Sequence, residues 1–309
     1  MIVGLAFNCD VSKGQERMMD LIQFIIDGLA LGSVYALIAV GYSMVFGVLQ
    51  LVNFAHGEFY MIGSYFVMLA LTAGAPWPVA IVAGGICVGL FAVLVEHLVY
   101  KPLRGAGKLA PLITAVGLSL FLQNFVQTFY SPNPQNFPVH LPDGMFEWGE
   151  DLLVRQRDVL IFIVTLALTG LLQLFVNKTK PGSGIRAVAM HQQAARIVGV
   201  PFNRTVALTF FMGAFMAVIA GALQGMATNQ IWPLMGVNSG LKAFAAAVLG
   251  GIGVLPGALL GGLVLGVCES LLVGYDLSTY KDGAAFLILI VVLLVRPQGL
   301  LGKPRMVKV

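Results

Sequence analysis

Residues 78–95 read PVAIVAGGICVGLFAVLV and contain no charged side chain. A helix of about 20 apolar residues crosses the hydrocarbon core of a membrane, which is roughly 30 Å thick. The apolar character is continuous here, whereas a strand of a membrane barrel would alternate apolar and polar residues. The stretch therefore predicts a membrane-spanning α-helix.

The composition of the whole chain agrees with this prediction. Of the 309 residues, 58% are hydrophobic and 10% are charged, against about 25% charged residues in a soluble domain. So few charges cannot cover a water-facing surface of this size, and lipid is the solvent that accepts the apolar surface. The net charge of +4 comes from cations in short loops, so membrane topology explains it and no nucleic-acid partner is expected.

Apolar segments recur along the chain at about residues 21–48, 57–73, 78–100, 109–130, 158–177, 206–228, 238–253, 255–273 and 283–296. They predict an all-α integral membrane protein, a polytopic bundle of about 8–9 transmembrane segments with a broken or re-entrant helix. The stretch from Leu49 to His56 is a candidate kink or re-entrant segment. The glycines and proline between Gly250 and Gly257 form either a tight turn between two short helices or a break that lines a pathway.

The loops predict the orientation of the chain. Lysine and arginine residues follow the third, fifth and last apolar segments, and short loops rich in such residues stay in the cytoplasm. The Pro-rich, acidic loop 131–156 is expected outside. Nine crossings then place the N-terminus outside and the C-terminus in the cytoplasm. Glu96, just before the basic loop, is expected at the membrane interface.

Four parts of the chain are expected. Residues 1–18 form a disordered N-terminal tail, or translation begins at Met18 or Met19. Residues 19–302 form a single transmembrane domain, within which 178–205 is a cytoplasmic loop, and residues 303–309 form a cytoplasmic tail.

The loop 178–205 predicts one short helix. Pro181 and Gly182 break the preceding helix, residues 185–198 favour a helix, and Gly199 ends it. This helix is too short and too polar to cross a membrane. It lies on the membrane surface as a connection, or it docks against another protein; both alternatives stay open at this point.

The run QAARIVG from Gln193 to Gly199 resembles the EAA loop of ABC importer permeases. The first residue is Gln instead of the Glu typical of that loop. In that family the motif is the coupling helix, which sits in a cleft of the ATPase subunit. The resemblance implies a coupling role for His191, Gln193, Ala194, Ala195, Arg196 and Gly199. The small Ala194 and Ala195 suit tight docking, and Gly199 suits a sharp exit turn.

Four further stretches resemble the branched-chain amino acid permeases, and their LivH-like half in particular. They are GLALGSVYAL (28–37), NFAHGE (53–58), APLIT (110–114) and GLKAFAAAVLGG (240–251), and the likeness runs from about residue 19 to 302. The resemblance implies the permease subunit of an ATP-driven importer in a bacterial inner membrane, with alternating access. The implied cargo is branched-chain or similar small amino acids; other amino acids, amides and urea stay open.

The resemblance also implies partners. They are a second permease, either LivM-like or another copy of this chain, two cytoplasmic ATPase subunits, an extracytoplasmic binding protein and membrane lipid. A phosphate-binding loop needs GxxxxGK followed by Ser or Thr, but Leu109 follows Lys108 and Pro102 occupies the first glycine position. ATP is therefore expected on the partner subunits, with no cofactor on this chain. Without paired catalytic groups or metal-ligand spacing, we expect no enzymatic activity.

Polar residues inside membrane spans are costly and are candidates for the translocation pathway. They are Asn53, His56, Glu58, Gln123, Asn124, Lys242 and Glu269. Each also has a structural interpretation: helix capping, hydrogen bonding between helices, or, for the last two, mutual pairing or extension to the interface. An alternative function uses His56, Glu58 and the break at residues 250–257 in an ion-coupled secondary transporter or channel for a small polar solute.

Overall fold

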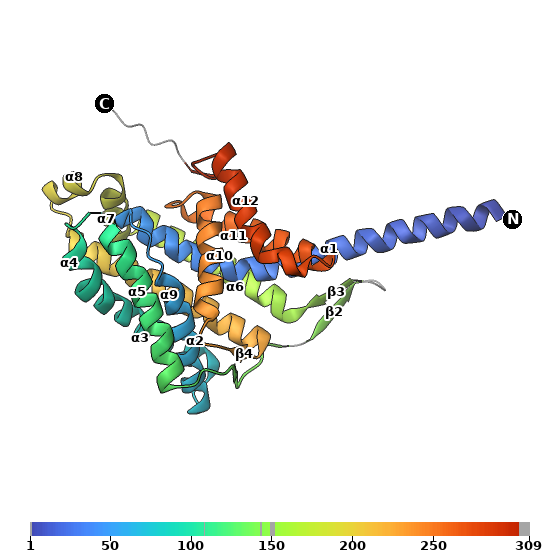
Figure 1. Cartoon of the computed structure of the whole chain (residues 1–309), viewed down its shortest axis with the longest axis horizontal. Helices are drawn as coiled ribbons and strands as arrows, with labels where there is room; N and C mark the ends of the chain where they lie inside the picture. Colours follow the sequence, from blue (N-terminus) through green and yellow to red (C-terminus); the bar gives the residue numbers. More distant parts are fainter. Residues whose placement is uncertain (1, 108, 143, 149–151, 303–309) are drawn as a thin grey trace.

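Figure 1 shows the computed structural model of the chain, which describes residues 2–107, 109–142, 144–148 and 152–302. Within these residues, seven spans are long and apolar enough to cross a membrane: Met18–Leu49, Trp77–Leu103, Leu109–Phe129, Gln156–Lys178, Phe202–Thr228, Leu255–Gly274 and Ser278–Val295. They belong to the helices α1 (Ile2–Leu49), α3 (Trp77–Val95), α5 (Leu109–Phe129), α6 (Gln156–Lys178), α9 (Phe202–Thr228), α11 (Leu255–Gly274) and α12 (Lys281–Val295). The expected all-α polytopic membrane fold is confirmed.

Two shorter helices complete the bundle. α2 (His56–Thr72) and α10 (Met235–Gly250) have 17 and 16 residues. Each begins inside the bundle after a non-helical stretch, and the first residues of both helices are buried. Within the described residues, these two helices and the seven spans agree with the expected eight to nine segments and with a broken helix.

The remaining elements connect the spans. The turn η1 (Glu96–Tyr100) and α4 (Lys101–Leu103) extend α3, and η2 (Ser278–Tyr280) precedes α12. α7 (Lys180–Met190) and α8 (Gln192–Ile197) form the loop between α6 and α9. Four short strands pair in twos: β1 (Gln135–Asn136) with β4 (Gln230–Ile231), and β2 (Met145–Trp148) with β3 (Leu152–Arg155), both antiparallel. The loop 131–156 thus contains more regular structure than the sequence predicts.

The bundle has two distinct ends (Figure 1). α4, α7 and α8 lie at one end, called here the loop end, together with the last turns of α1 and α10. The strands lie at the other end, called here the strand end, where Arg157 at the start of α6 donates to the carbonyl of Ala227 near the end of α9 at 3.1 Å. When α2 (His56–Thr72) and α10 (Met235–Gly250) are included with the spans, consecutive helices of the bundle alternate in direction.

The break at Gly250–Gly257 is a tight turn. Gly251 and Gly253 have φ angles of 107° and 92°, which favour glycine. The backbone N–H groups of Leu300 and Leu301 donate to the carbonyls of Leu249 and Gly250 at 2.8 and 3.0 Å. The C-terminal segment thereby satisfies carbonyl groups at the end of α10. Of the two alternatives, the turn between two helices is the observed one.

The segment expected as an N-terminal tail is helical from Ile2 onward. It continues α1 without interruption and projects away from the bundle (Figure 1). The expected tail at residues 1–18 stays a prediction. Translation from Met18 or Met19 stays a prediction, and the expected tail at 303–309 lies outside the described residues.

α1 is the central helix of the bundle, and its residues from Ser33 to Val45 are almost all buried. It packs most extensively on α11 and also contacts α9, α10 and α6. Glycines make the α1–α11 contact close: a Cβ atom on Gly32 would lie 2.7 Å from the carbonyl oxygen of Gly262. Small residues let membrane helices approach backbone to backbone, which increases dispersion contacts where no hydrophobic effect drives helices together.

We predict that Gly32→Val destabilises the protein because the added methyl groups force α1 and α11 apart. Overpacking of this kind costs about 1–3 kcal/mol, so the thermal midpoint in detergent falls. Gly170→Val on α6 is the control, since a Cβ there meets nothing within 4 Å. Equal midpoints for the two variants would contradict the close contact.

Candidate functional site

The loop between α6 and α9 contains two helices where the sequence predicts one. α7 ends at Met190, and His191 adopts an extended conformation with φ −156° and ψ 104°. The His191 ring nitrogen Nδ1 accepts the N–H of Ala194 at 3.1 Å, so His191 caps the N-terminus of α8. The expected single helix over 185–198 is wrong because this cap starts a new helix. Pro181 lies in the first turn of α7, after α6 has ended at Lys178.

Gly199 makes the exit turn from α8. Its φ angle of 83° is in the left-handed region, which favours glycine. The N–H of Val200 donates to the carbonyl of Ala195 at 2.9 Å and closes the turn. Pro201 follows and precedes α9. The exit turn at Gly199 is confirmed.

The exposed face of α8 differs from the expected one. Ala195 is 3% exposed and packs inside its own subunit, so it is not available for docking in this conformation. His191, Gln193, Ala194, Arg196 and Gly199 are exposed. Beside them Met190, Ile197 and Val198 have exposed fractions of 78%, 86% and 76%. An apolar tip of this kind on a polar loop is typical of a contact with another protein.

The loop is fixed to the bundle by polar and aromatic contacts. The Gln192 side chain donates to the carbonyl of Val48, in the last turn of α1, at 2.9 Å. The guanidinium groups of Arg196 and Arg104 lie 4.1 and 5.0 Å from the centre of the Phe202 ring. These contacts border a cavity of about 550 Å³. A displacement of α8 therefore acts directly on α1.

Glu96 is part of this anchoring, and its side chain is buried within the bundle. It is 2% exposed and forms an ion pair with Arg104, which also donates to Asn203 at 2.8 Å. The sequence places Glu96 close to the basic residues of the loop, but only the turn η1 brings its carboxylate inward.

Asn53 and His56 have structural roles at the start of α2. The Asn53 side-chain oxygen accepts the Tyr100 hydroxyl at 2.6 Å and the N–H of Ala55 at 3.1 Å. The His56 ring fills a slot between glycines of α1 and α9: a Cβ on Gly41 or Gly213 would lie 3.0 or 3.2 Å from its Cε1 atom. The side chains of Asn53 and His56 thus stabilise a helix that begins inside the bundle.

Glu58 and Gln123 are brought together. One carboxylate oxygen of Glu58, Oε1, accepts the Ser119 hydroxyl at 2.7 Å and the Gln123 amide at 2.8 Å. Its other oxygen, Oε2, is buried without a hydrogen-bond partner among the described residues. Asn124 is separate from this group, because its side chain is exposed and donates to the carbonyl of Leu120.

Lys242 and Glu269 form a second buried group, as expected from their possible pairing. Their ion pair measures 2.7 Å, and Lys242 also pairs with Asp282 at 2.7 Å. The Tyr35 hydroxyl donates to Glu269 at 3.0 Å. The group joins α1, α10, α11 and α12. Tyr35 and Asp282 were missed in the sequence because residues so far apart in the chain give no local signal.

We predict that Lys242→Met destabilises the protein by about 3–5 kcal/mol, because the buried Glu269 loses its counter-charge. The double variant Lys242→Met/Glu269→Gln recovers part of this loss, since the uncompensated charge is gone. Thermal unfolding in detergent measures both effects, with Lys281→Met at the first residue of α12 as control. A double variant no more stable than the single one would contradict the pairing.

The described residues contain no cluster of three or more His, Cys, Asp or Glu side chains that could hold a metal ion. What remains is a bundle of apolar helices with buried polar groups between them and an exposed helical loop at one end. This arrangement is that of a polytopic membrane protein with an exposed helical loop at one end.

Comparisons with known proteins give the family. Residues 24–295 match the family of the branched-chain amino acid transport system permease component. The high-affinity branched-chain amino acid transport permease BraD of Pseudomonas aeruginosa is 43% identical over 93% of this chain and 98% of its own. LivH of Escherichia coli is 39% identical over 95% and 99%. The structure of PsaBC from Streptococcus pneumoniae covers 96% of this chain and 97% of its own at 15% identity, with a TM-score of 0.47.

The chain belongs to the family of branched-chain amino acid transport permeases. It is the membrane-spanning permease component of an ABC-type importer, and it is not itself an enzyme. The resemblance that the sequence motifs indicate is thereby confirmed.

Proposed function

We propose that this chain imports leucine, isoleucine and valine across a bacterial inner membrane, with the loop end and the C-terminus in the cytoplasm. The cargo follows from the named substrates of BraD and LivH, which match nearly the whole chain. The basic residues of the loop end support the orientation, because short cytoplasmic loops are rich in lysine and arginine.

The observation that supports ATP coupling is the apolar tip of α8. Ile197 and Val198 are exposed at the loop end, on a helix too short to enter the membrane. An ATPase subunit that covers this tip buries apolar surface at about 25 cal/mol per Å². The coupling residues are then His191, Gln193, Ala194, Arg196 and Gly199, with Ala195 holding α8 against its own subunit.

Movement of the ATPase reaches the pathway through α1. The bond from Gln192 to Val48 joins α8 to the end of α1. α1 in turn contributes Tyr35 to the Lys242–Glu269 group. A close-packed helix transmits such a displacement because packed interfaces do not deform continuously. Alternating access then follows from repacking of α1 against α10 and α11.

The importer needs further subunits. Two cytoplasmic ATPases bind the coupling loops, an extracytoplasmic protein delivers the cargo, and a second permease, LivM-like or another copy of this chain, completes the pathway.

Asn238 of α10 and Asn124 of α5 are exposed within helices of the bundle. Polar side chains inside a membrane face a partner or a water-filled path in preference to lipid, so this face is where the second permease packs.

We predict that Gly199→Val weakens ATPase binding about tenfold, because a β-branched residue in a left-handed conformation costs about 1–3 kcal/mol. Binding of the purified ATPase to the detergent-solubilised permease measures this. Gly105→Val at the same end is the control, since Gly105 is not left-handed and a Cβ there meets nothing within 4 Å. Unchanged binding by Gly199→Val would exclude the coupling role.

The test of the whole proposal is purification of the tagged chain with its partners, followed by uptake of radioactive leucine in proteoliposomes. The expected result is an ATPase and a second permease in the complex, and uptake that requires ATP and the binding protein. Uptake that follows an ion gradient and persists without ATP would overturn the proposal in favour of a secondary transporter.

A further inference from the structure

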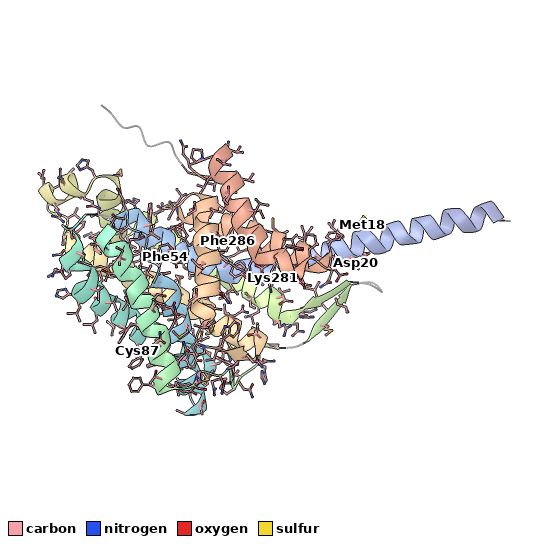
Figure 2. All side chains as sticks on the ribbon, in the orientation of Figure 1. Met18, Asp20, Phe54, Cys87, Lys281 and Phe286 are labelled. Atoms are coloured by element: carbon pink, nitrogen blue, oxygen red, sulfur yellow. The ribbon has the colours of Figure 1, made fainter. Side chains whose placement is uncertain are left out.

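A cavity of about 330 Å³ lies between α1, α5 and α10. Ligand cavities in proteins run from about 300 to 1,000 Å³, so this one is large enough for a single amino acid. Most of its wall is apolar and comes from Phe54, Val116, Leu120, Val237 and Leu241. Phe54, labelled in Figure 2, lies beside Phe244 of α10 with ring centres 5.7 Å apart.

One side of the cavity is polar. Ser119 and Gln123 line it, and both donate to the same oxygen of Glu58. Glu58 is 1% exposed, so these two side chains lie between its carboxylate and the cavity. The free oxygen of Glu58, Oε2, faces Gly236, another residue of the cavity wall: a Cβ on Gly236 would lie 2.7 Å from this oxygen.

The position of Glu58 is set by two helix N-termini. Glu58 is in the first turn of α2, and Gly236 is in the first turn of α10. The helices meet without intervening side chains, since a Cβ on Gly240 would lie 3.0 Å from the Cα of Gly57. Helix N-termini bear partial positive charge and stabilise an anion. Half-helices that begin inside a membrane bundle are used in this way in transporters.

A carboxylate oxygen buried without a partner is costly. An ammonium group has three hydrogen-bond donors and a positive charge. It could therefore supply the hydrogen bond that the free oxygen of Glu58 lacks and pair with the carboxylate charge. Neither Lys242 nor an arginine fills this role, because Lys242 pairs with Glu269 and Asp282. Nothing else in the described residues donates to the free oxygen.

We propose that this cavity is a transient binding site for the α-amino acid cargo inside the permease, with Glu58 receiving the ammonium group. The inference rests on the proposed import of branched-chain amino acids. During transport, Ser119 and Gln123 release the carboxylate to the ammonium group. The cargo carboxylate lies toward the first turn of α10, and its branched side chain contacts Val116, Leu120 and Leu241. The permease thereby adds its own selectivity for zwitterionic amino acids with apolar side chains.

The first experiment measures leucine uptake by the complete importer in proteoliposomes. Glu58→Gln keeps the size of the side chain and removes its charge, and we expect uptake to fall about tenfold or more, as for loss of a hydrogen bond to a charged group. Glu58→Asp keeps the charge and recovers most of the uptake. Co-purification of the ATPase shows that each variant is folded.

A second pair of variants tests the cavity independently of the carboxylate. Leu120→Trp fills the cavity and is expected to lower uptake about tenfold, while co-purification of the second permease and the ATPase shows that the assembly is intact. Phe121→Trp is the matched control: it is the next residue, it is 62% exposed and it does not line the cavity. Uptake by this control should equal that of the wild-type importer.

A direct binding measurement uses saturation-transfer NMR on the solubilised complex without its binding protein. Leucine should receive saturation from the wild-type complex, and 4-methylpentanoate, which lacks the ammonium group, should not. Glu58→Gln should abolish the leucine signal. Equal signals from both compounds, or an unchanged leucine signal with Glu58→Gln, would overturn the site.

The outcomes separate this inference from the proposed function. If the wild-type importer takes up no leucine, the proposed cargo is wrong. If it takes up leucine, and Glu58→Gln and Leu120→Trp do so at the same rate, the cargo stands and only the binding site is excluded.

Discussion

The fold depends on one constraint: in lipid, every backbone N–H and C=O group must find its partner inside the protein. In the part of the chain that the structure describes, seven spans meet it as long helices. α2 and α10 meet it differently, because both begin inside the bundle, where their first turns are covered by protein. Asn53 accepts backbone and side-chain donors at the start of α2, and the C-terminal segment satisfies carbonyls at the end of α10. The helices are therefore interrupted where other parts of the protein satisfy the free backbone N–H and C=O groups.

Close contacts at glycines hold the helices together and enclose the charged side chains between them. Without a hydrophobic force between helices in lipid, backbone proximity supplies the packing energy. Gly32 lets α1 approach α11, and Gly57 and Gly240 let α2 approach α10. The side chains that flank these contacts are then enclosed with them: Glu58 beside α10, and Tyr35 beside Glu269. The same glycines that stabilise the bundle thus bring its charged groups to defined positions.

α1 contacts both the loop between α6 and α9 and the buried charged groups of the bundle. Its last turn accepts the hydrogen bond from Gln192 of the loop. Its middle lines the cavity between α5 and α10 through Tyr42 and joins the Lys242–Glu269 group through Tyr35. The loop end exposes the apolar side chains of Ile197 and Val198, whereas Asn124 of α5 and Asn238 of α10 are exposed along the bundle. In the proposed function, work received at α8 reaches the buried charged groups along this central helix.

The sequence by itself determined the membrane fold, its segments and the family. Continuous apolar runs are local, and the motif from Gln193 to Gly199 is contiguous, so both can be recognised without a structure. It also predicted that Lys242 and Glu269 could pair. The split of the loop at His191 comes from a local cap, which the sequence analysis did not recognise. The burial of Ala195 and of Glu96 depended on tertiary packing. Only the tertiary structure separated Asn124 from Gln123 and added Tyr35 and Asp282 to the ion pair. The physical reason is that the length of an apolar run can be read from consecutive residues, whereas the partner of a buried charge depends on which helices pack together.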